Sequence, residues 1–379
     1  MKAILLLLLS LWITPAAAAD DDEPARVHCK TCKHVGRRPC KEHKKAECEL
    51  ELNAQYCSFV ADCEACEGVG WVDCDRCENP AGEEWLAARR RSQAELAEEH
   101  RNLDEEMRRT LLKAASEHFV VVWDLEDMKV GRKRLDGHEL LHLYLDRLET
   151  LFDDYVEIFD AGEGDFQKRL KVMVWWLEKD QLEASLRFCN NGSKRGVKLL
   201  GSTPIYSVCG NRQNFKDDET LHRSVIHNVS HLMLSHHSPS NWVGNIKGGW
   251  ADAGVAHYFE ERYFQLCTNY CYTEGSSLLD FKGGRWKPAI RKMVAMGDAP
   301  PVAQVFTKNT DTLTLPEHAV SFSYVDYLIH LDGAKANRLF RRLRGKTPTR
   351  DALKEVYGLS VLEFEEAWGA WVVDTYPAR

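Results

Sequence analysis

The sequence predicts an α+β protein, in which a mixed β-sheet lobe is followed by a helical lobe and preceded by a small cysteine-rich module and a long connecting helix. Three observations support this fold class. Nine of the thirteen cysteines lie between residues 29 and 77. Apolar runs typical of strands occur between residues 118 and 220. Helical periodicity dominates after residue 220. We therefore expect four segments: a signal peptide, a cysteine-rich module, a helical linker and a large domain, at 1–19, 20–80, 81–117 and 118–379.

The first segment has the pattern of a secretory signal peptide. Lys2 precedes an apolar run from Ala3 to Ile13, and small residues end the segment at Ala19. The run is too short to span a bilayer, and no later stretch is long and apolar enough to do so. We expect an exported protein, periplasmic or secreted, with no membrane span in its mature part. Because the net charge is −8, we expect no nucleic-acid partner.

The cysteine-rich module contains an internal repeat with an offset of 34 residues. The segment from Cys29 to His43, CKTCKHVGRRPCKEH, aligns with the segment from Cys63 to Cys77, CEACEGVGWVDCDRC. Their four C-x-x-C or C-x-x-H pairs suffice for two tetrahedral zinc sites. The candidate zinc ligands are Cys29, Cys32, Cys40, His43, Cys63, Cys66, Cys74 and Cys77.

The string CEACEGVG, from Cys63 to Gly70, resembles the C-x-x-C-x-G-x-G repeat of the DnaJ cysteine-rich domain. The resemblance implies that the outer pairs share one zinc ion and the inner pairs the other. The outer pairs are Cys29, Cys32, Cys74 and Cys77, and the inner pairs are Cys40, His43, Cys63 and Cys66. The alternative pairing closes each repeat on its own ion.

A disulfide scaffold is the competing interpretation of the module, because export favours disulfide formation. If zinc fills two sites, Cys48 and Cys57 remain as one possible disulfide. An even number of cysteines then remains in the large domain, namely Cys189, Cys209, Cys267 and Cys271.

The helical linker and the sheet lobe follow from the pattern of apolar residues. From Glu83 to about Ser116 the chain has no Gly or Pro and carries an apolar stripe, which predicts one long helix. An amphipathic helix is predicted from about Gly137 to Glu157. Strands are predicted at His118–Trp123, Leu170–Leu177, Val197–Leu200 and Pro204–Cys209.

The stretch from Leu221 to Arg262 carries the main candidate functional residues of the large domain. Apolar residues at three- and four-residue steps predict a helix on which His227 and His231 lie four positions apart. This spacing places both imidazoles on one helix face, as in helices that bind zinc through H-E-x-x-H. Here the residue after the first histidine is Asn228.

The H-N-x-x-H motif, followed by GWADAGVAHYFE, resembles the thermolysin-like metallopeptidases, also called gluzincins or the peptidase MA-like group. The resemblance implies a thermolysin-like fold over about 118–379. It also implies that Asn228 replaces the general-base glutamate and Ala253 the third-ligand glutamate. An amide cannot take a proton from zinc-bound water, and a general base contributes roughly 10²–10⁴-fold in rate. We therefore expect no ordinary peptidase turnover.

Alternatives remain open at this motif. Asp252 or His257 could complete a zinc site with His227 and His231, or the two histidines could be metal-free and hydrogen-bonded. Helices are also predicted near Pro288–Met296, at His318–Leu331 and at the carboxyl terminus. Tyr324 lies in the predicted helix at His318–Leu331. The resemblance makes it a candidate for stabilising an oxyanion, and the alternative is that its side chain belongs to the hydrophobic core.

These expectations define three functional hypotheses. The first is an exported zinc protein whose large domain has lost hydrolysis and binds a polypeptide or scaffolds a protein partner. The second is an atypical zinc metallopeptidase that uses His227, His231 and either Asp252 or His257. The third is a disulfide-stapled adhesion or envelope protein, which would contain neither zinc nor free thiols.

Overall fold

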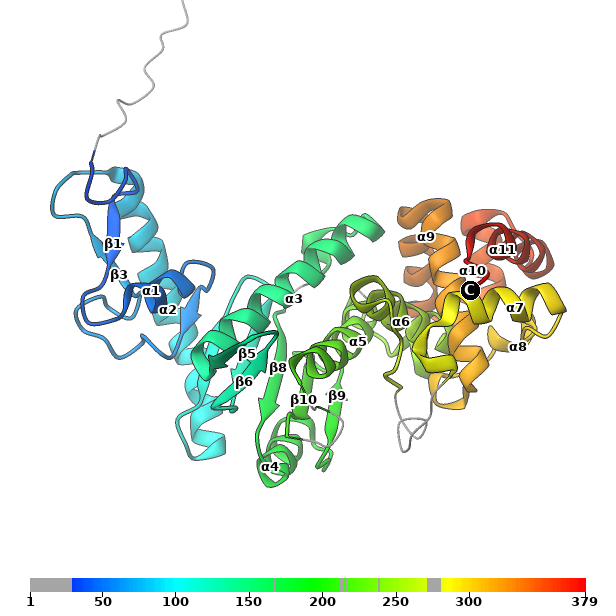
Figure 1. The fold of residues 1–379 in the computed structure, drawn as a ribbon, viewed down its shortest axis with the longest axis horizontal. Coiled ribbons are helices and arrows are strands. Elements are labelled where there is room, and N and C mark those ends of the chain that lie inside the picture. Colours follow the sequence, from blue (N-terminus) through cyan, green and yellow to red (C-terminus); the bar gives the residue numbers. More distant parts are fainter. Residues whose placement is uncertain (1–28, 167, 212–214, 216, 238, 271–280) are drawn as a thin grey trace, which may run out of the picture.

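The computed structural model describes residues 29–379 except 167, 212–214, 216, 238 and 271–280. Three parts follow one another along the long axis: the cysteine-rich module, the sheet lobe and the helical lobe (Figure 1). The expected signal peptide lies outside the described residues. Within the described part of the chain, no helix has the length and apolar character that a membrane span needs.

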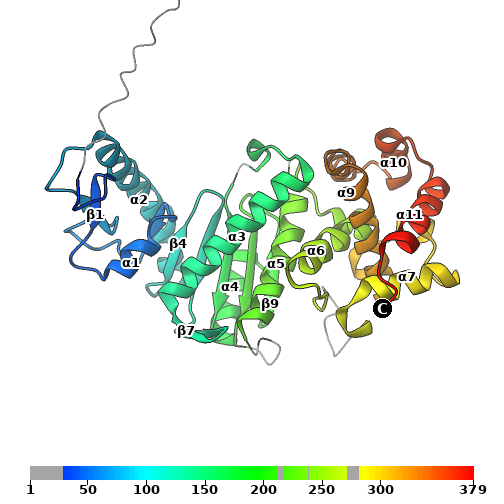
Figure 2. The same ribbon diagram turned by 45° about the horizontal axis from the view of Figure 1, so that its top comes forward.

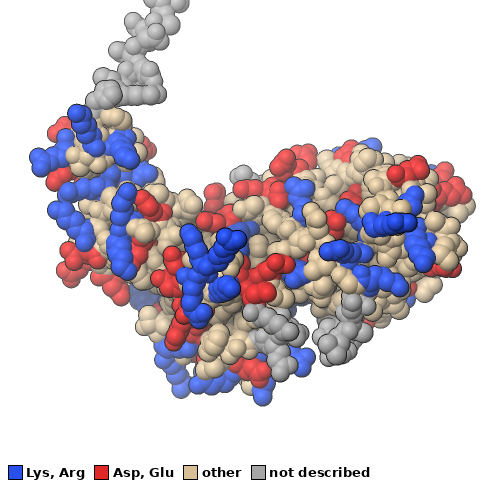
Figure 3. Space-filling view, in the orientation of Figure 1, with Lys and Arg blue, Asp and Glu red and all other residues tan. Residues whose placement is uncertain are grey.

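The module is built around two short strands that belong to equivalent positions of the sequence repeat. Strand β1 (Arg37–Pro39) pairs antiparallel with β3 (Trp71–Asp73), with Arg38 opposite Val72. Because these two residues are 34 positions apart, the ladder relates the two repeats by an approximate two-fold axis. Helix α1 (Lys45–Leu50) and strand β2 (Tyr56–Cys57) lie between them in the chain. Basic and acidic side chains are mixed over the visible face of the module (Figure 3).

Helix α2 (Pro80–Met107) connects the module to the sheet lobe. Asn79 caps its first turn by accepting a hydrogen bond from the backbone N–H of Ala81, and Arg108 ends it in the left-handed conformation, with φ 53°. The prediction that this helix continues to about Ser116 is wrong, because Leu112–Ala115 forms strand β4. Pairing of β4 with strands on both sides outweighs its local helix propensity.

The sheet lobe contains a six-stranded mixed sheet with the order β2-β4-β5-β8-β10-β9. The pairs β5–β8 and β8–β10 are parallel, and the other pairs are antiparallel. These pairings confirm the α+β class and the mixed sheet. Strand β2 comes from the module, so the module is part of this sheet. The remaining strands are β5 (Phe119–Trp123), β8 (Leu170–Trp175), β9 (Gly196–Leu199) and β10 (Ile205–Cys209).

Side chains of the central strands alternate between two hydrophobic layers. Val121 and Val172 face the layer that contains helix α3 (Gly137–Phe159), which runs across one face of the sheet (Figures 1 and 2). Val122 and Met173 face the opposite layer, with the end of α2 and helix α4 (Glu178–Cys189). The sequence did not predict helix α4. It also did not predict the hairpin that β6 (Asp127–Val130) and β7 (Lys133–Asp136) form.

The helical lobe is organised around α5 (Asp218–His236) and α6 (Gly249–Phe264), which pack against each other as the two halves of the motif stretch. Gly254 lets α6 approach α9 (Leu315–Arg344) closely, because a Cβ atom there would lie 2.5 Å from the carbonyl oxygen of Ser321. The other helices are α7 (Trp286–Met296), α8 (Val302–Val305), α9 (Leu315–Arg344), α10 (Thr349–Tyr357) and α11 (Val361–Thr375). Short 3₁₀ turns occur at Glu163–Asp165, Val243–Asn245, Lys282–Gly284 and Thr310–Thr312.

Candidate metal sites

The outer cluster of the module brings together the thiols of Cys29, Cys32, Cys74 and Cys77. The sulfur atoms of Cys29 and Cys74 are 3.7 Å apart, and those of Cys32 and Cys77 are 3.5 Å apart. A disulfide would require about 2.05 Å. Four sulfurs that each lie about 2.3 Å from one tetrahedral zinc ion are about 3.8 Å apart. The observed spacing therefore fits a shared ion and does not fit disulfides.

The inner cluster consists of Cys40, His43, Cys63 and Cys66. Nε2 of His43 lies 3.8 Å from the sulfur of Cys66, and the backbone N–H of Gly70 donates a hydrogen bond to that sulfur at 3.2 Å. The ligand atoms lie within 4.8 Å of one another. Three sulfurs and one imidazole nitrogen form a common ligand set for a structural zinc ion.

The antiparallel pairing of β1 and β3 explains why the clusters combine the outer pairs and the inner pairs. The C-x-x-C pair before β1 lies beside the pair that follows β3, and the pair after β1 lies beside the one that precedes β3. The alternative, in which each repeat closes on its own ion, is wrong for this arrangement. Equivalent backbone positions share the left-handed conformation, including Gly36 and Gly70, with φ 72° and 77°.

The thiols of the outer cluster differ in acidity. A hydrogen bond from the backbone N–H of Cys32 lowers the pKa of Cys29 to about 6, and the thiolate is the form that binds metals. In contrast, burial and hydrogen bonds with Cys32 and Cys29 raise the pKa of Cys77. Metal binding requires deprotonated thiols, so a cation bound here would compensate the charge of the thiolates.

No disulfide involves any of the twelve cysteines that the structure describes. The possible disulfide between Cys48 and Cys57 is therefore wrong. The thiol of Cys48 contacts the carbonyl oxygen of Cys40 at 3.8 Å, and Cys57 lies in a separate group with Glu51 and two histidines. Cys271, one of the four cysteines expected in the large domain, lies outside the described residues.

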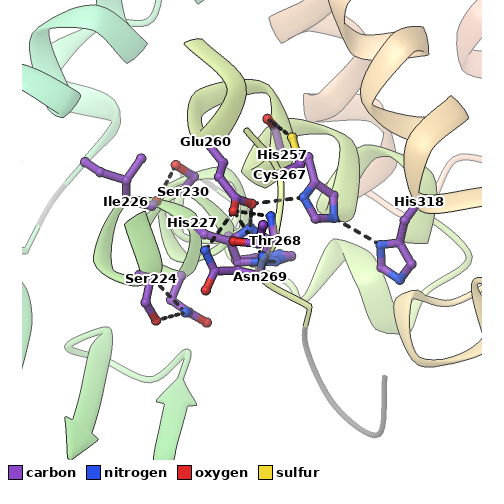
Figure 4. A network of polar contacts seen from close by, with 12 residues as sticks. Ser224, Ile226, His227, Ser230, His257, Glu260, Cys267, Thr268, Asn269 and His318 are labelled. Carbon is purple, nitrogen blue, oxygen red and sulfur yellow. Dashed lines mark hydrogen bonds and ion pairs between the residues drawn. The ribbon is translucent and has the colours of Figure 1, made fainter. Parts of the chain in front are cut away.

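Helices α5 and α6 form a second kind of site, which we call the histidine–carboxylate cluster: His227, His231, Asp252, His257 and Glu260. The Nε2 atoms of His227 and His231 are 3.2 Å apart. Nδ1 of His227 lies 3.1 Å from a carboxylate oxygen of Glu260, as Figure 4 shows, and Nδ1 of His231 lies 2.9 Å from Asp252. A carboxylate behind each imidazole fixes the ring and makes its outer nitrogen a better metal ligand.

Glu260 is the central polar group of this cluster. Its Oε1 atom accepts hydrogen bonds from the backbone N–H groups of Thr268, at 2.6 Å, and Asn269, at 3.0 Å (Figure 4). Its Oε2 atom is shared by His227 and by Nδ1 of His257, at 3.2 Å. Burial acts to raise the pKa of Glu260, but hydrogen bonds with the two histidines outweigh it and lower this pKa to about 2. Glu260 is therefore an anion.

The histidine–carboxylate cluster is buried. Glu260 and His257 are inaccessible to solvent, and His227 and His231 are each only 1% exposed. Burial lowers the pKa of His257 well below the usual range, so this ring is a neutral imidazole. Its Nε2 atom lies 3.2 Å from Nδ1 of His318 on α9. Neutral imidazoles and a carboxylate are ligands that zinc accepts, and His227, His257 and Glu260 are close enough to share one ion.

The two alternatives for a third ligand, Asp252 and His257, make different contacts. His257 joins His227 through Glu260, whereas Asp252 lies behind His231 and also accepts a hydrogen bond from Thr310 at 2.7 Å. Asp252 thus contacts the inner nitrogen of His231 and is not among the residues that lie close enough to His227 to share one ion with it. Sequence analysis missed Glu260 as a site residue, although its position three residues after His257 places both on one helix face.

The positions of the expected catalytic carboxylates hold no acid. The amide nitrogen of Asn228 donates a hydrogen bond to the carbonyl oxygen of Ser224 at 2.8 Å, one turn earlier in α5. Ala253 is a buried methyl group in the hydrophobic core. Tyr324 packs its ring among aromatic residues of the helical lobe, including Trp250 and Trp368. The described contacts of Tyr324 match the core alternative.

No protein-family model matches the chain, and no curated protein is significantly similar to it. The fold and the sites thus define an α+β protein with a mixed sheet, in which clusters of cysteine, histidine and glutamate could hold metal ions, with zinc a plausible ion.

Proposed function

We propose that this chain is an exported zinc protein whose thermolysin-like domain has lost peptidase activity and binds a polypeptide or scaffolds a protein partner. In this proposal, the outer and inner clusters each hold one structural zinc ion. The pairing of two facing helices with the H-N-x-x-H motif and the α+β order of elements support a thermolysin-like domain.

The hydrogen bond of Asn228 is the observation that carries the proposal. A general base needs an accepting lone pair directed at the attacking water. Asn228 instead directs its amide N–H group back into its own helix, at the carbonyl oxygen of Ser224. A carboxylate could not make this bond, because it has no proton to donate when ionised. The local structure around position 228 thus suits an amide and disfavours the glutamate of an active enzyme.

The burial of the histidine–carboxylate cluster supports the same proposal. A catalytic zinc ion keeps an open position for water and substrate. Here His227 and His231 are almost fully buried. A zinc ion bound there would act as a Lewis acid on any ligand that reached it. The carboxylates of Glu260 and Asp252 fix the imidazoles of His227 and His231 between α5 and α6, and this positioning is a structural role.

The second candidate is an atypical metallopeptidase that uses His227, His231 and either Asp252 or His257. It is favoured by the 3.2 Å separation of the two Nε2 atoms and by the carboxylates behind both rings. These features are those of metal-ligating histidines.

One experiment separates the two candidates. The purified mature chain is incubated with a fluorescently labelled, permanently unfolded polypeptide, and binding is measured by anisotropy and cleavage by gel electrophoresis. We expect saturable binding without cleavage. Cleavage that is abolished both by a chelator and by His227→Ala would overturn the proposal and support the metallopeptidase. Absence of both binding and cleavage would contradict both candidates.

A further inference from the structure

A fourth group of potential metal ligands lies where the cysteine-rich module meets the sheet lobe. We call it the joint cluster, and it consists of Glu51, Cys57, His138 and His142. All four side chains are buried: Glu51 and Cys57 are inaccessible to solvent, and the histidines are 5% and 2% exposed. It shares no residue with the cysteine clusters or with the histidine–carboxylate cluster.

Three separate elements bring these residues together. Glu51 directly follows α1, Cys57 belongs to β2, and both histidines lie in the first turns of α3. The four-residue spacing of His138 and His142 places both rings on the helix face that meets the module. Their ring centroids are 4.8 Å apart, with nearly perpendicular planes.

The contacts within the joint cluster converge on one carboxylate oxygen. Oε1 of Glu51 lies 2.8 Å from Nε2 of His138 and 3.3 Å from Nε2 of His142. The candidate ligand atoms, including the sulfur of Cys57, lie within 4.8 Å of one another. Ligands at 2.0–2.3 Å from a tetrahedral ion are about 3.3–3.8 Å apart, so side-chain movements of about 1 Å would close the widest gap.

The surroundings hold the ligands in place. Arg89 donates a hydrogen bond to the backbone carbonyl of Glu51 at 2.7 Å, and Gln93 bonds both backbone groups of Cys57 at 3.2 and 3.3 Å. The ring of Phe59 stacks on His138 at a centroid distance of 3.9 Å. The joint cluster is therefore supported by a second layer of contacts, as metal sites in proteins generally are.

Hydrogen bonding within the protein leaves part of the joint cluster unsatisfied. Among the described residues, Oε2 of Glu51 and Nδ1 of His142 have no hydrogen-bond partner although both atoms are buried. Buried polar atoms are nearly always paired, and each exception needs an explanation such as an ion. One carboxylate, one thiolate and two neutral imidazoles would balance the double charge of a zinc ion.

We propose that Glu51, Cys57, His138 and His142 bind a zinc ion that fastens the cysteine-rich module to the sheet lobe. Zinc accepts a ligand set of one sulfur, two nitrogens and one oxygen. This set differs from those of the outer and inner clusters, which contain four and three sulfurs. The site is closed and its ligands are buried, so its role is structural: it fixes α3 against the segment between α1 and β2.

The test counts zinc ions in the full mature chain. The double variant Cys57→Ser/His142→Gln is compared with the control Cys189→Ser/His100→Gln, which changes one buried cysteine and one buried histidine outside every cluster. After gel filtration with a moderate chelator, folded protein is analysed for zinc by mass spectrometry. We expect the double variant to contain one zinc ion fewer per chain than wild type, and the control to contain the same number. Equal zinc content in wild type and the folded double variant would overturn the proposal.

A second measurement keeps the proposal testable if the double variant does not fold. The wild-type chain is loaded with ¹¹³Cd, whose resonance position depends on how many sulfurs bind it. The outer and inner clusters would give resonances of four- and three-sulfur sites. We expect an additional resonance from a site with one sulfur. A spectrum of the loaded chain without such a resonance would contradict the proposal. A cadmium ion bound at His227 would have no sulfur ligand in the histidine–carboxylate cluster, so it would not give this resonance.

Discussion

The cysteine clusters and the histidine–carboxylate cluster reach similar local chemistry by different routes. In the cysteine clusters, three C-x-x-C pairs and one C-x-x-H pair on a duplicated segment supply every ligand, and one antiparallel ladder brings the pairs together. Between α5 and α6, ligands and supporting carboxylates come from two packed helices, and a loop after α6 holds Glu260. The first kind of site can be recognised from spacing alone, whereas the second depends on packing.

The two regions also differ in what stabilises them without metal. The hydrophobic clusters of the module are small and consist largely of the cysteines themselves. The histidine–carboxylate cluster is surrounded by the main hydrophobic core, which extends from the sheet to α11. Small modules rarely fold on their apolar core alone. Metal removal should therefore affect the module far more than the helical lobe.

The largest expected effect is that of Cys74→Ser on the module. Structural zinc contributes about 10–16 kcal/mol of apparent binding free energy in zinc-finger peptides, which exceeds the stability of many domains. We expect loss of one zinc ion per chain and rapid proteolysis within residues 29–77, with the helical lobe still folded. Zinc analysis and limited proteolysis with mass spectrometry measure both results.

The matched control for Cys74→Ser is Cys189→Ser, which changes a buried cysteine of α4 outside the clusters. Its effect on the free energy of unfolding should be about 1 kcal/mol, with no loss of zinc. If Cys74→Ser keeps its zinc and resists proteolysis like this control, the contrast between the two regions is lost.

A smaller effect is expected for Glu260→Gln in the histidine–carboxylate cluster. The substitution removes the charge that accepts hydrogen bonds from the loop and supports two histidines. Hydrogen bonds to charged groups are worth about 1.5–3 kcal/mol, so the free energy of unfolding should fall by about 2–3 kcal/mol. Metal affinity at His227 should fall about 10–100-fold. Urea unfolding and competition with a chelator measure the two quantities.

Glu261→Gln is the control for this prediction, because Glu261 is the next residue and pairs with Lys287 at 3.2 Å, outside the cluster. It should cost less than about 1 kcal/mol. Equal destabilisation by both substitutions would show that Glu260 has no special role in holding the histidines.

The smallest expected effect concerns His100, a histidine that is buried near cationic side chains. Burial, assisted by the cations of Lys171 and Lys113, lowers the pKa of His100 on α2 to about 3. In the unfolded chain, this histidine has a pKa near 6.5. The unfolded state therefore binds more protons between these values, and the contribution of His100 to stability falls as the pH falls below 6.5.

We expect His100→Phe to remove this penalty. Relative to wild type, the unfolding free energy of the variant should rise by about 2 kcal/mol between pH 7 and pH 5. Urea titrations at both pH values measure the difference. An unchanged difference would mean that His100 is protonated in the folded protein, like a histidine that faces a carboxylate.

Much of the fold could be predicted from local patterns. The helix expected from about Gly137 to Glu157 corresponds to α3, and the strand expected at Leu170–Leu177 corresponds to β8. The end of α2 could not be predicted, because Arg108 adopts its left-handed conformation without glycine or proline nearby. The hairpin of β6 and β7 was missed because its strands are short and mostly charged.

The candidate sites could be predicted to different degrees, because only the cysteine clusters draw their ligands from short, recognisable motifs of the sequence. The grouping of cysteines followed from a resemblance, and the structure adds its cause, the ladder between β1 and β3. Glu51 and His138 are 87 positions apart in the chain and lack any common motif. Only the packing of α3 against the module brings them together, so sequence spacing could not reveal the joint cluster.

The position of β2 in the large sheet has a practical consequence for anyone who shortens this protein. A fragment that starts after residue 80 would lack Tyr56 and Cys57, which pair with Ala115 and Ala114. The backbone N–H and C=O groups of β4 would then form a bare sheet edge, and such edges recruit other chains. Expression trials should therefore keep the amino-terminal module, because its removal would turn a closed surface into a starting point for aggregation.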